Sequence, residues 1–377
     1  MSLPAIVEDF LELAVLPSNS RQERILADAL RAKLTALGLT VEEDGTGPLI
    51  QGEAGNLIAR LPGDPRIPAI MFSAHLDRVA NHGHIQPIMA EDGAVIRSDG
   101  TSILGADDVS GLCAILDGLR RVRAEGLPHG EIEVVLSVAE EVGLQGALHL
   151  DYDRIKSKMA YVIDTGGPVG TLVNQAPTQY TLAVKVRGRS AHAGMEPEKG
   201  LSAIRVAAAA LTRLREGRLS PYTTANFGCF QAGLATNIVC DFALVKGEAR
   251  SSRPEELAAY LEEVDRVFQE VAAEYQTDIS VERHLEYETF RVDEIETVIQ
   301  LAGRAMASLG LPLSVVATGG GMDGNHFNHH GIKAVGLSPG YVGVHTSKEE
   351  QPVAQLIQCG QLVAGIIKES ASLARDS

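Results

Sequence analysis

Aspartate, glutamate and histidine recur at places in the chain where a predicted strand or loop leads into a helix. The residues concerned are His75 and Asp77, Asp107 and Asp108, Glu140 and Glu141, Asp164, and His345. Carboxylates and imidazoles, without thiolates, suit zinc, cobalt or manganese in a hydrolytic site. The pattern therefore predicts a metal centre built from segments that are far apart in the sequence.

Each of these segments, taken singly, also has an ordinary structural explanation. A histidine that follows a strand, such as His75, is more often a surface or hydrogen-bonding residue than a ligand. Aspartate is common at the N-cap and in the first turn of a helix, which would explain Asp107 and Asp108. Adjacent glutamates commonly lie in a solvated loop. The joint pattern favours the metal centre, because four successive strand–helix junctions each carry an acid or a histidine. Functional groups gather at strand ends in open α/β sheets.

The spacing within two segments assigns different tasks to neighbouring side chains. Two metal ions about 3.5–4 Å apart need a bridging carboxylate, and each ion needs one histidine and one further carboxylate. Asp77 lies two residues after His75, so on an extended strand it faces the same way and is expected to accept the other ring N–H of the histidine. Glu140 and Glu141 point in opposite directions, so one can bind a metal while the other activates water.

The elements that must position these residues alternate between strands and helices. Short apolar runs bounded by Pro and Gly predict strands, and apolar residues at helical spacing predict helices. We expect strands at 56–61, 69–75, 131–139 and 159–164, with helices at 109–123 and 146–151. This alternation predicts a three-layer α/β domain with a largely parallel sheet.

An earlier helix is expected after the segment Ser20-Arg-Gln-Glu23. This segment has the pattern of a capping box, in which the serine and the glutamate bond reciprocally to the main chain at a helix start. Apolar residues at 25, 26, 30 and 34 keep helical spacing, and Gly38 follows them. The pattern therefore predicts a helix that begins near residue 23.

The pattern of predicted strands and helices changes near residue 175, and the first pattern returns near residue 291. The middle part predicts a β-α-β-β-α-β order, which is the ferredoxin-like pattern. Its elements are expected at 180–187, 201–214, 226–231, 236–250, 254–275 and 278–283. After it we expect a helix at 294–309, a strand at 313–318, a strand near 334 and a helix at 352–373. The chain is thus predicted to hold an α/β catalytic domain, residues 1–175 and 291–377, interrupted by an inserted domain, residues 176–290.

Composition excludes several classes of partner. With 377 residues, two domains are the default expectation. The 33 Lys and Arg against 49 Asp and Glu give a formal net charge of −16, which argues against nucleic acid and against an anionic membrane surface. No apolar run approaches the length of a membrane span, and the N-terminal segment predicts an acidic amphipathic helix instead of a signal peptide. Together with four scattered cysteines, this predicts a cytoplasmic protein.

The motifs together resemble a known family, the peptidase T, acetylornithine deacetylase and carboxypeptidase G family of co-catalytic zinc exopeptidases. The likeness rests on Ser73-Ala-His-Leu-Asp77, Gly105-Ala-Asp-Asp108, Ala139-Glu-Glu-Val-Gly143, Tyr161-Val-Ile-Asp164, Gly188-Arg-Ser-Ala-His-Ala-Gly194 and His345. These motifs follow the family order over almost the whole chain. The peptidase T branch, whose members are aminotripeptidases, is the most similar, through Leu104-Gly-Ala-Asp-Asp and Glu-Glu-Val-Gly-Leu-Gln-Gly.

The resemblance implies a zinc-exopeptidase (phosphorylase/hydrolase-like) catalytic domain and a role for each ligand. Asp107 would bridge two divalent ions, with zinc expected and cobalt or manganese as alternatives, and its peptide bond to Asp108 is expected to be cis. The resemblance implies that His75 and Asp164 complete one metal site and that Glu141 and His345 complete the other. By the same likeness Glu140 is the general base, and Asp77 supports the catalytic group.

The inserted domain would act as a lid and as the surface of a homodimer. His192 matches the histidine that, in the family, reaches the active site from the partner subunit and stabilises the oxyanion. Asn237 and Arg250 are expected on strands of the lid. In the family, residues at these places bind the carbonyl and the C-terminal carboxylate of the substrate. Asp323 belongs to Gly319-Gly-Gly-Met-Asp-Gly324, which matches a segment that lines the substrate pocket.

The chain departs from the family pattern in positions that leave the ligands intact. Met322 replaces a threonine, Arg78 replaces a small residue, and Val109 replaces a common lysine. Arg78 and Met322 are expected to alter the choice of substrate. A short peptide, cut to release the N-terminal residue of a tripeptide, is the expected substrate.

Other functions remain alternatives at this point. An N-acyl amino acid deacylase or carboxypeptidase-like enzyme of the same family would carry the same ligands. An inactive binding or scaffold relative should have lost a ligand or the base, and this sequence keeps them. A second family of zinc aminopeptidases places its extra domain between the first histidine and the Asp-Asp pair, where this chain has only a short segment, His75 to Asp107.

Overall fold

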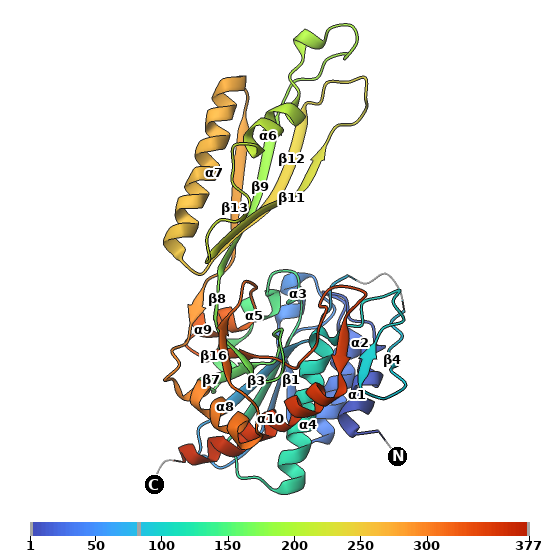
Figure 1. Cartoon of the computed structure of the whole chain (residues 1–377), viewed down its shortest axis with the longest axis vertical. Coiled ribbons are helices and arrows are strands. Elements are labelled where there is room, and N and C mark those ends of the chain that lie inside the picture. Colours follow the sequence, from blue (N-terminus) through green and yellow to red (C-terminus); the bar gives the residue numbers. More distant parts are fainter. Residues whose placement is uncertain (1–2, 81–83, 375–377) are drawn as a thin grey trace. The chain divides into compact units, whose positions relative to one another are not determined.

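The computed structural model describes residues 3–80 and 84–374, which form two compact units. The first unit contains the described residues up to Gln175, then Arg291–Thr318 and the described residues from Met322 onward. The second unit contains Ala176–Phe290 together with Gly319–Gly321. The glycine triplet at 319–321 therefore groups with the second unit, although it follows the first unit's β15 (Ser314–Ala317) in the sequence. Figure 1 shows both units and labels many of their helices and strands.

A single mixed sheet forms the centre of the first unit. Its strand order is β1-β2-β6-β3-β7-β16-β8-β14, and β15 pairs with β8. The bounds are β1 Thr40–Glu43, β2 Leu57–Leu61, β3 Ile70–His75, β6 Ile132–Ser137, β7 Met159–Val162, β8 Thr171–Ala176, β14 Phe290–Arg291 and β16 Lys333–Leu337. The four central strands β6, β3, β7 and β16 run parallel and are mostly buried.

The prediction of a largely parallel sheet is correct for this centre and for the pair of β15 and β8, but not for the other strand pairs described below. On one side β2 is antiparallel to β6 and to β1, and on the other side β8 is antiparallel to β16. A parallel neighbour needs a crossover of a dozen or more residues, usually a helix. Residues 62–69 between β2 and β3 contain no helix, so the chain returns in the opposite direction.

Helices cover the sheet and pack on one another. The long helix α4 (Ala106–Glu125) contacts β3, α10 (Val353–Ser370) packs against α4, α8 and α1, and α8 (Thr297–Ser308) contacts β7 and β16. The others are α1 Ala5–Ala14, α2 Arg24–Ala36, α3 Thr46–Ile50, α5 Gln145–Leu148 and α9 Gly324–His329. A small separate sheet joins β17 (Glu350–Pro352), β5 (Val95–Arg97) and β4 (Ile88–Met89). Among the described residues, no helix is long and apolar enough to cross a membrane.

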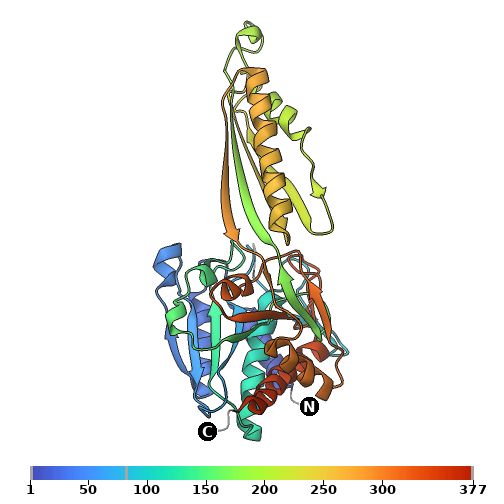
Figure 2. The same ribbon diagram turned by 90° about the vertical axis from the view of Figure 1, so that its left-hand side faces the viewer.

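The second unit has the predicted ferredoxin-like arrangement. Its antiparallel sheet has the order β10-β11-β12-β9-β13. The bounds are β9 Thr178–Arg187, α6 Ala203–Leu211, β10 Gly217–Arg218, β11 Thr223–Ala232, β12 Phe242–Ser251, α7 Pro254–Tyr275 and β13 Ile279–Tyr287. Figure 2 shows α7 lying along this sheet. Buried residues such as Val184, Val206 and Phe268 form a core of its own.

Two local predictions about the chain are wrong. The strand expected at 236–250 begins only at Phe242, because a turn occupies the preceding residues, with the Ile238 N–H donating to the Ala235 carbonyl at 3.4 Å. Ser20 and Glu23 do not form a capping box. The Ser20 hydroxyl donates to Asp77 Oδ2 at 2.6 Å, and α2 begins at Arg24 without a side-chain cap. The long-range partner of Ser20 therefore replaces the local one.

Candidate metal centre

The predicted ligands come together because the elements that carry them end at one edge of the sheet. His75 is the last residue of β3, Asp164 follows β7, and Glu140 and Glu141 follow β6. These three strands are parallel neighbours, so their carboxyl ends meet. The N-terminus of α4 brings in the fifth residue, Asp107.

Asp107 lies at the centre of the cluster and uses its two carboxylate oxygens on different partners. Oδ1 is 2.9 Å from His75 Nε2, and Oδ2 is 3.2 Å from His345 Nε2. The same His345 nitrogen is 2.9 Å from Glu141 Oε1. A carboxylate that faces one histidine with each oxygen has the geometry that a bridging ligand needs.

The residues of both expected groups lie close together. His75 Nε2 is also 3.9 Å from Asp164 Oδ1, and that oxygen accepts a hydrogen bond from the Tyr341 hydroxyl at 3.0 Å. Donor atoms of His75, Asp107 and Glu141 lie within 4.8 Å of one another, as do those of His75, Glu140 and Asp164. The second group includes Glu140, so the predicted base also lies within reach of the ligands.

Asp77 supports the cluster in a different way from the one predicted. The His75 ring nitrogen Nδ1 lies 2.9 Å from the Asp77 main-chain oxygen, whereas the Asp77 carboxylate is 3.5 Å away. The carboxylate instead accepts the main-chain N–H groups of Glu140, at 2.8 Å, and Glu141, at 3.2 Å. Asp77 therefore orients His75 through its carbonyl and holds the Glu140–Glu141 segment through its side chain.

The segment that carries Asp107 is held by a glutamate that the sequence did not single out. Glu349 is buried, and its carboxylate accepts the N–H groups of Gly105 at 2.5 Å, Ala106 at 3.1 Å and Asp107 at 3.3 Å. The peptide bond between Asp107 and Asp108 is cis, as the resemblance implies. The only sequence signal for Glu349 is its position four residues after His345.

Asp108 has a structural task, and its hydrogen-bond partners differ from those of Asp107. Its oxygens accept the main-chain N–H groups of His75, at 3.1 Å, and Gly111, at 3.0 Å. It therefore ties the end of β3 to the first turn of α4. Burial raises the pKa of Asp108 well above its ordinary value.

Several acids with raised pKa values are buried side by side in the cluster. Burial, reinforced by Asp107, raises the pKa of Asp164 to about 8, and burial, reinforced by Asp164, raises the pKa of Glu140 well above its ordinary value. For Asp107, burial raises the pKa, but the hydrogen bonds from His345 and His75 outweigh it and lower the value overall. Buried like charges are tolerated when a cation offsets them. The excess of carboxylate and the absence of a thiolate fit zinc, cobalt or manganese.

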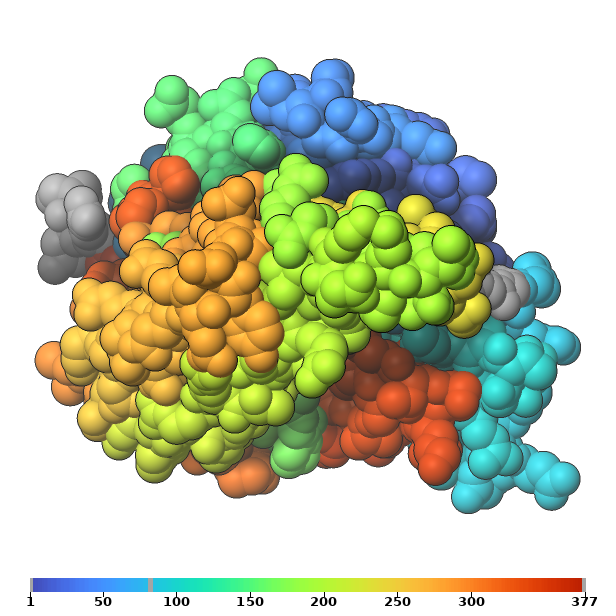
Figure 3. Space-filling view, turned by 90° about the horizontal axis from the view of Figure 1, so that it is seen from above, coloured from blue at the N-terminus to red at the C-terminus, as the bar shows by residue number. Residues whose placement is uncertain are grey.

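The remaining predicted residues of the inserted domain lie in the second unit. His192 is exposed, and its Nδ1 accepts the N–H groups of Gly194 at 3.2 Å and Met195 at 3.1 Å. Since Nδ1 accepts, the proton of the neutral ring lies on Nε2, which can donate to a ligand. The surrounding segment, residues 189–200 (light green), lies at the surface in the space-filling view of Figure 3.

Asn237 and Arg250, two of the three predicted substrate-binding residues, differ in the contacts that they make within the protein. Asn237 is exposed in the loop before β12, not on a strand as expected, and its carbonyl accepts the Ala193 N–H at 3.0 Å. Arg250 on β12 forms a two-point contact with Glu248, at 2.9 Å from Nε and 2.9 Å from Nη2. A substrate carboxylate would therefore have to compete with Glu248 for this guanidinium.

Asp323 and Met322 are buried beneath the cluster. Asp323 is 1% exposed and accepts a short hydrogen bond from the Ser137 hydroxyl, and burial raises its pKa to about 6. Met322 is also 1% exposed, and its side chain lies against Gly324 and Gly336. Because Met322 is buried, its position does not support the expectation that it alters the choice of substrate.

Arg78 is likewise turned into the protein. It is 4% exposed, and its guanidinium donates to the main-chain carbonyls of Ala14 at 2.8 Å, Leu13 at 3.2 Å and Leu16 at 2.7 Å. It thereby closes the C-terminal end of α1, where main-chain carbonyls lack partners. The buried position of Arg78 gives no support to the expectation that it alters the choice of substrate, because its guanidinium is bonded to the main chain at the end of α1 and to Leu16.

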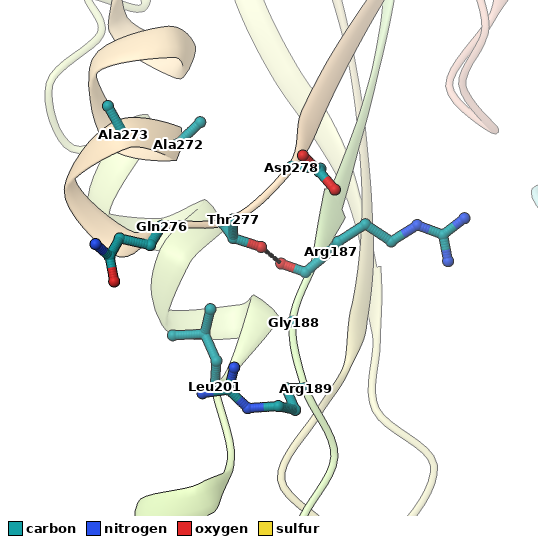
Figure 4. Close-up of a pocket in the computed structure, with 9 residues that line it drawn as sticks. All are labelled: Arg187, Gly188, Arg189, Leu201, Ala272, Ala273, Gln276, Thr277 and Asp278. Carbon is teal, nitrogen blue, oxygen red and sulfur yellow. Dashed lines mark hydrogen bonds between the residues drawn. The ribbon is translucent and has the colours of Figure 1, made fainter.

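A separate hollow of about 450 Å³ lies on the second unit. It is formed by Arg187–Arg189, Leu201 and the end of α7 up to Asp278, and the Thr277 hydroxyl donates to the Arg187 carbonyl at 2.7 Å (Figure 4). Its lining holds one carboxylate and no histidine or cysteine. With a single carboxylate, this hollow lacks the set of ligands that the metal cluster has.

Comparisons with known proteins agree with this architecture. Residues 179–276 match the model of the peptidase dimerisation domain, and residues 56–180 match the model of peptidase family M28. The second stretch contains His75, Asp107, Glu141 and Asp164.

Three relatives match nearly the whole chain. The crystal structure of the aminopeptidase PepT from Bacillus cereus is 39% identical, covers 97% of this chain and 98% of that chain, and has a TM-score of 0.87. A tripeptidase from Staphylococcus aureus is 36% identical, covers 97% of this chain and 98% of its own, and has a TM-score of 0.92. The uncharacterized protein YqjE of Bacillus subtilis is 37% identical over 366 residues, which are 97% of this chain and 98% of that protein.

Metal binding is expected to release protons from the cluster. Hydrogen bonds to Asp107 and Glu141 raise the pKa of His345 to about 10, and burial raises the pKa of Asp164 to about 8, so both groups carry a proton at pH 7 before a metal binds. A metal takes only the unprotonated forms. We therefore expect affinity to rise as the pH is raised from about 7 toward these pKa values.

Calorimetry measures this release directly. Zinc is titrated into the protein in two buffers with different heats of ionisation, and the two apparent heats should differ. The His345→Ala variant should release fewer protons per metal ion than the original chain. Equal heats in both buffers would show that the cluster is already unprotonated and would contradict the expectation.

Proposed function

Since the chain belongs to the peptidase T-like family of these relatives, we propose that it is a two-metal aminopeptidase that removes the N-terminal residue of tripeptides. The observation that carries the proposal is the position of Asp107, whose oxygens lie 2.9 Å from His75 and 3.2 Å from His345. The peptidase activity is supported by the relatives at 39% and 36% identity, an aminopeptidase and a tripeptidase.

The donor set assigns a ligand group to each ion. We propose that Asp107 is shared, that His75 and Asp164 complete one site, and that Glu141 and His345 complete the other. We expect zinc, with cobalt and manganese as alternatives, because the donors are imidazole and carboxylate. When bound, the ions would lower the pKa of a water molecule and polarise the scissile carbonyl.

Glu140 is proposed as the group that moves the proton. Its carboxylate is 9% exposed and lies among the donor atoms of His75 and Asp164. Burial raises its pKa, which makes it a stronger proton acceptor than an exposed glutamate. Glu140 would take a proton from the attacking water and deliver it to the leaving amine, so the peptide bond breaks and a free amino group forms. Asp77 supports this step by holding the main-chain N–H of Glu140 at 2.8 Å.

The second unit is proposed to serve substrate binding and assembly. The match to the peptidase dimerisation domain supports a homodimer in which this unit forms the contact. His192 would reach the site of the partner subunit and donate from Nε2 to the developing oxyanion. Arg250 and Asn237 would bind the substrate carboxylate and carbonyl, and Asp323 would shape the pocket from below. The four cysteines form no disulfide, which supports the proposal that the protein is cytoplasmic.

A panel of substrates tests the proposed activity. The metal-loaded protein is offered a tripeptide with a free N-terminus, the same tripeptide with an acetylated N-terminus, a dipeptide and an N-acetyl amino acid. We expect the free tripeptide to be cleaved fastest, with release of its first residue, identified by mass spectrometry. Fastest cleavage of the N-acetyl amino acid, or release of the C-terminal residue, would contradict the proposal.

The variant Glu140→Gln supplies the control for this panel. Gln keeps the volume of the side chain but cannot take a proton, so kcat on the tripeptide should fall at least about a hundredfold. The bound metal should stay nearly normal, because Glu140 is proposed as base and not as ligand. Near-normal turnover would refute the assigned role of Glu140.

His192 is expected to act across the dimer. The variant His192→Ala should lose about 10²–10³-fold in kcat, which is the usual effect of removing an oxyanion donor. Its thermal unfolding should be unchanged, since the ring is exposed. Mixing this variant with Glu140→Gln should restore activity in mixed dimers, where one site has both groups.

The matched control is His284→Ala, which removes another exposed histidine, with 72% of its side chain accessible, from β13 of the same unit. This variant should keep normal turnover. Mixed dimers of His192→Ala and Glu140→Gln, verified by native mass spectrometry, that show no activity would contradict the role across subunits.

A further inference from the structure

The segment before α2 connects the N-terminal part of the chain to the metal cluster. Ser18 and Asn19 run alongside the residue that follows Asp77, since the Arg78 N–H donates to the Ser18 carbonyl at 2.9 Å and Asn19 pairs with Arg78. Gln22 closes the turn by donating its N–H to Asn19 at 2.8 Å. The turn is therefore fixed to the end of β3, where the ligands begin.

Glu23 uses this anchored turn to hold the segment that carries the base. Its carboxylate is 0% exposed, and Oε1 accepts the N–H groups of Arg21 at 2.7 Å and Ala139 at 3.0 Å. The other oxygen, Oε2, has no hydrogen-bond partner. A buried glutamate with one unpaired oxygen is costly for stability alone, which points to a task beyond packing.

Ser20 acts on the next residues of the same segment through Asp77. Its hydroxyl donates to Asp77 Oδ2 at 2.6 Å, and the Asp77 carboxylate accepts the N–H groups of Glu140 and Glu141. Three successive main-chain N–H groups, from Ala139 to Glu141, are thus held by two carboxylates. Both carboxylates are in turn bonded to the turn at residues 20–23.

The held segment has a conformation that needs such support. Ala139 has a φ of 51°, in the left-handed region that residues other than glycine rarely adopt. This φ lets the chain leave β6 so that the next two carboxylates enter the cluster. Without an acceptor for its N–H, Ala139 could relax toward extended backbone and carry Glu140 with it.

We propose that Glu23 is a positioning residue for the catalytic step, with Ser20 as its auxiliary. It acts through Ala139 and fixes where the Glu140 carboxylate lies relative to the ligands. This inference rests on the proposed function for the role of Glu140, but the placement of the segment does not depend on that role. Outer groups of this kind typically change activity or metal affinity by about 10–100-fold.

Two substitutions of Glu23 distinguish the role of its hydrogen-bond acceptor from that of its side-chain volume. Glu23→Gln keeps Oε1 as an acceptor, so it should retain kcat close to that of the original chain. Glu23→Met keeps a similar volume and removes the acceptor, so kcat should fall by about tenfold or more. KM and the bound metal should change little, because the ligands themselves remain.

Glu133 provides the matched control. It is also 0% exposed and accepts main-chain N–H groups, from Lys156 at 3.2 Å and from Ser157 at 2.8 Å, but it lies at the opposite end of β6. Glu133→Met should lower thermal stability and leave kcat per folded molecule unchanged. If it lowers kcat as much as Glu23→Met does, the effect is general destabilisation and the proposal fails.

A second readout does not need an active enzyme. Amide hydrogen exchange, followed by mass spectrometry on fragments that cover residues 138–144, should speed up in Glu23→Met and stay unchanged in Glu23→Gln and Glu133→Met. Unchanged exchange and unchanged kcat in Glu23→Met would overturn the proposal. If the original chain cleaves no peptide but Glu23→Met still loosens this segment, the proposed function fails while the positioning role of Glu23 stands.

Discussion

The buried carboxylates at one edge of the sheet are the constraint on which the rest of the structure depends. Asp107 and Glu140 are buried, Asp164 lies close to them, and the three carboxylates can be ionised together only where positive charge offsets them. Such an arrangement is unfavourable unless cations occupy it. The parallel strands β3, β6 and β7 make it because their carboxyl ends meet, and each ends in one or two of the required side chains.

The loops that carry these side chains lack the regular hydrogen bonds of strands and helices, so further carboxylates hold them. Asp77 and Glu23 hold the segment of Glu140, and Glu349 holds the segment of Asp107. In each case a side-chain carboxylate accepts main-chain N–H groups that would otherwise be buried without partners. Precision at the cluster therefore comes from a second set of acids that need not touch a metal.

Sequence reasoning located the cluster but not its support. His75 and Asp164 were predictable, because strands that alternate with helices bring their ends together, and the bounds of α7 followed from its apolar spacing. Ser20 and Glu23 were misassigned because a capping box has the same local pattern, whereas Glu23 also binds the N–H of Ala139, 116 residues away. The partners of Arg78 were also out of reach of the sequence, since only the fold brings the Ala14 carbonyl at the end of α1 to its guanidinium.

The central claim is that Asp107 bridges two metal ions, and anomalous diffraction from zinc-loaded crystals tests it most directly. Data collected on either side of the zinc absorption edge should give two peaks per chain, one beside each oxygen of Asp107. One peak should adjoin His75 and Asp164, and the other should adjoin Glu141 and His345. A single peak, or peaks remote from Asp107, would contradict the account.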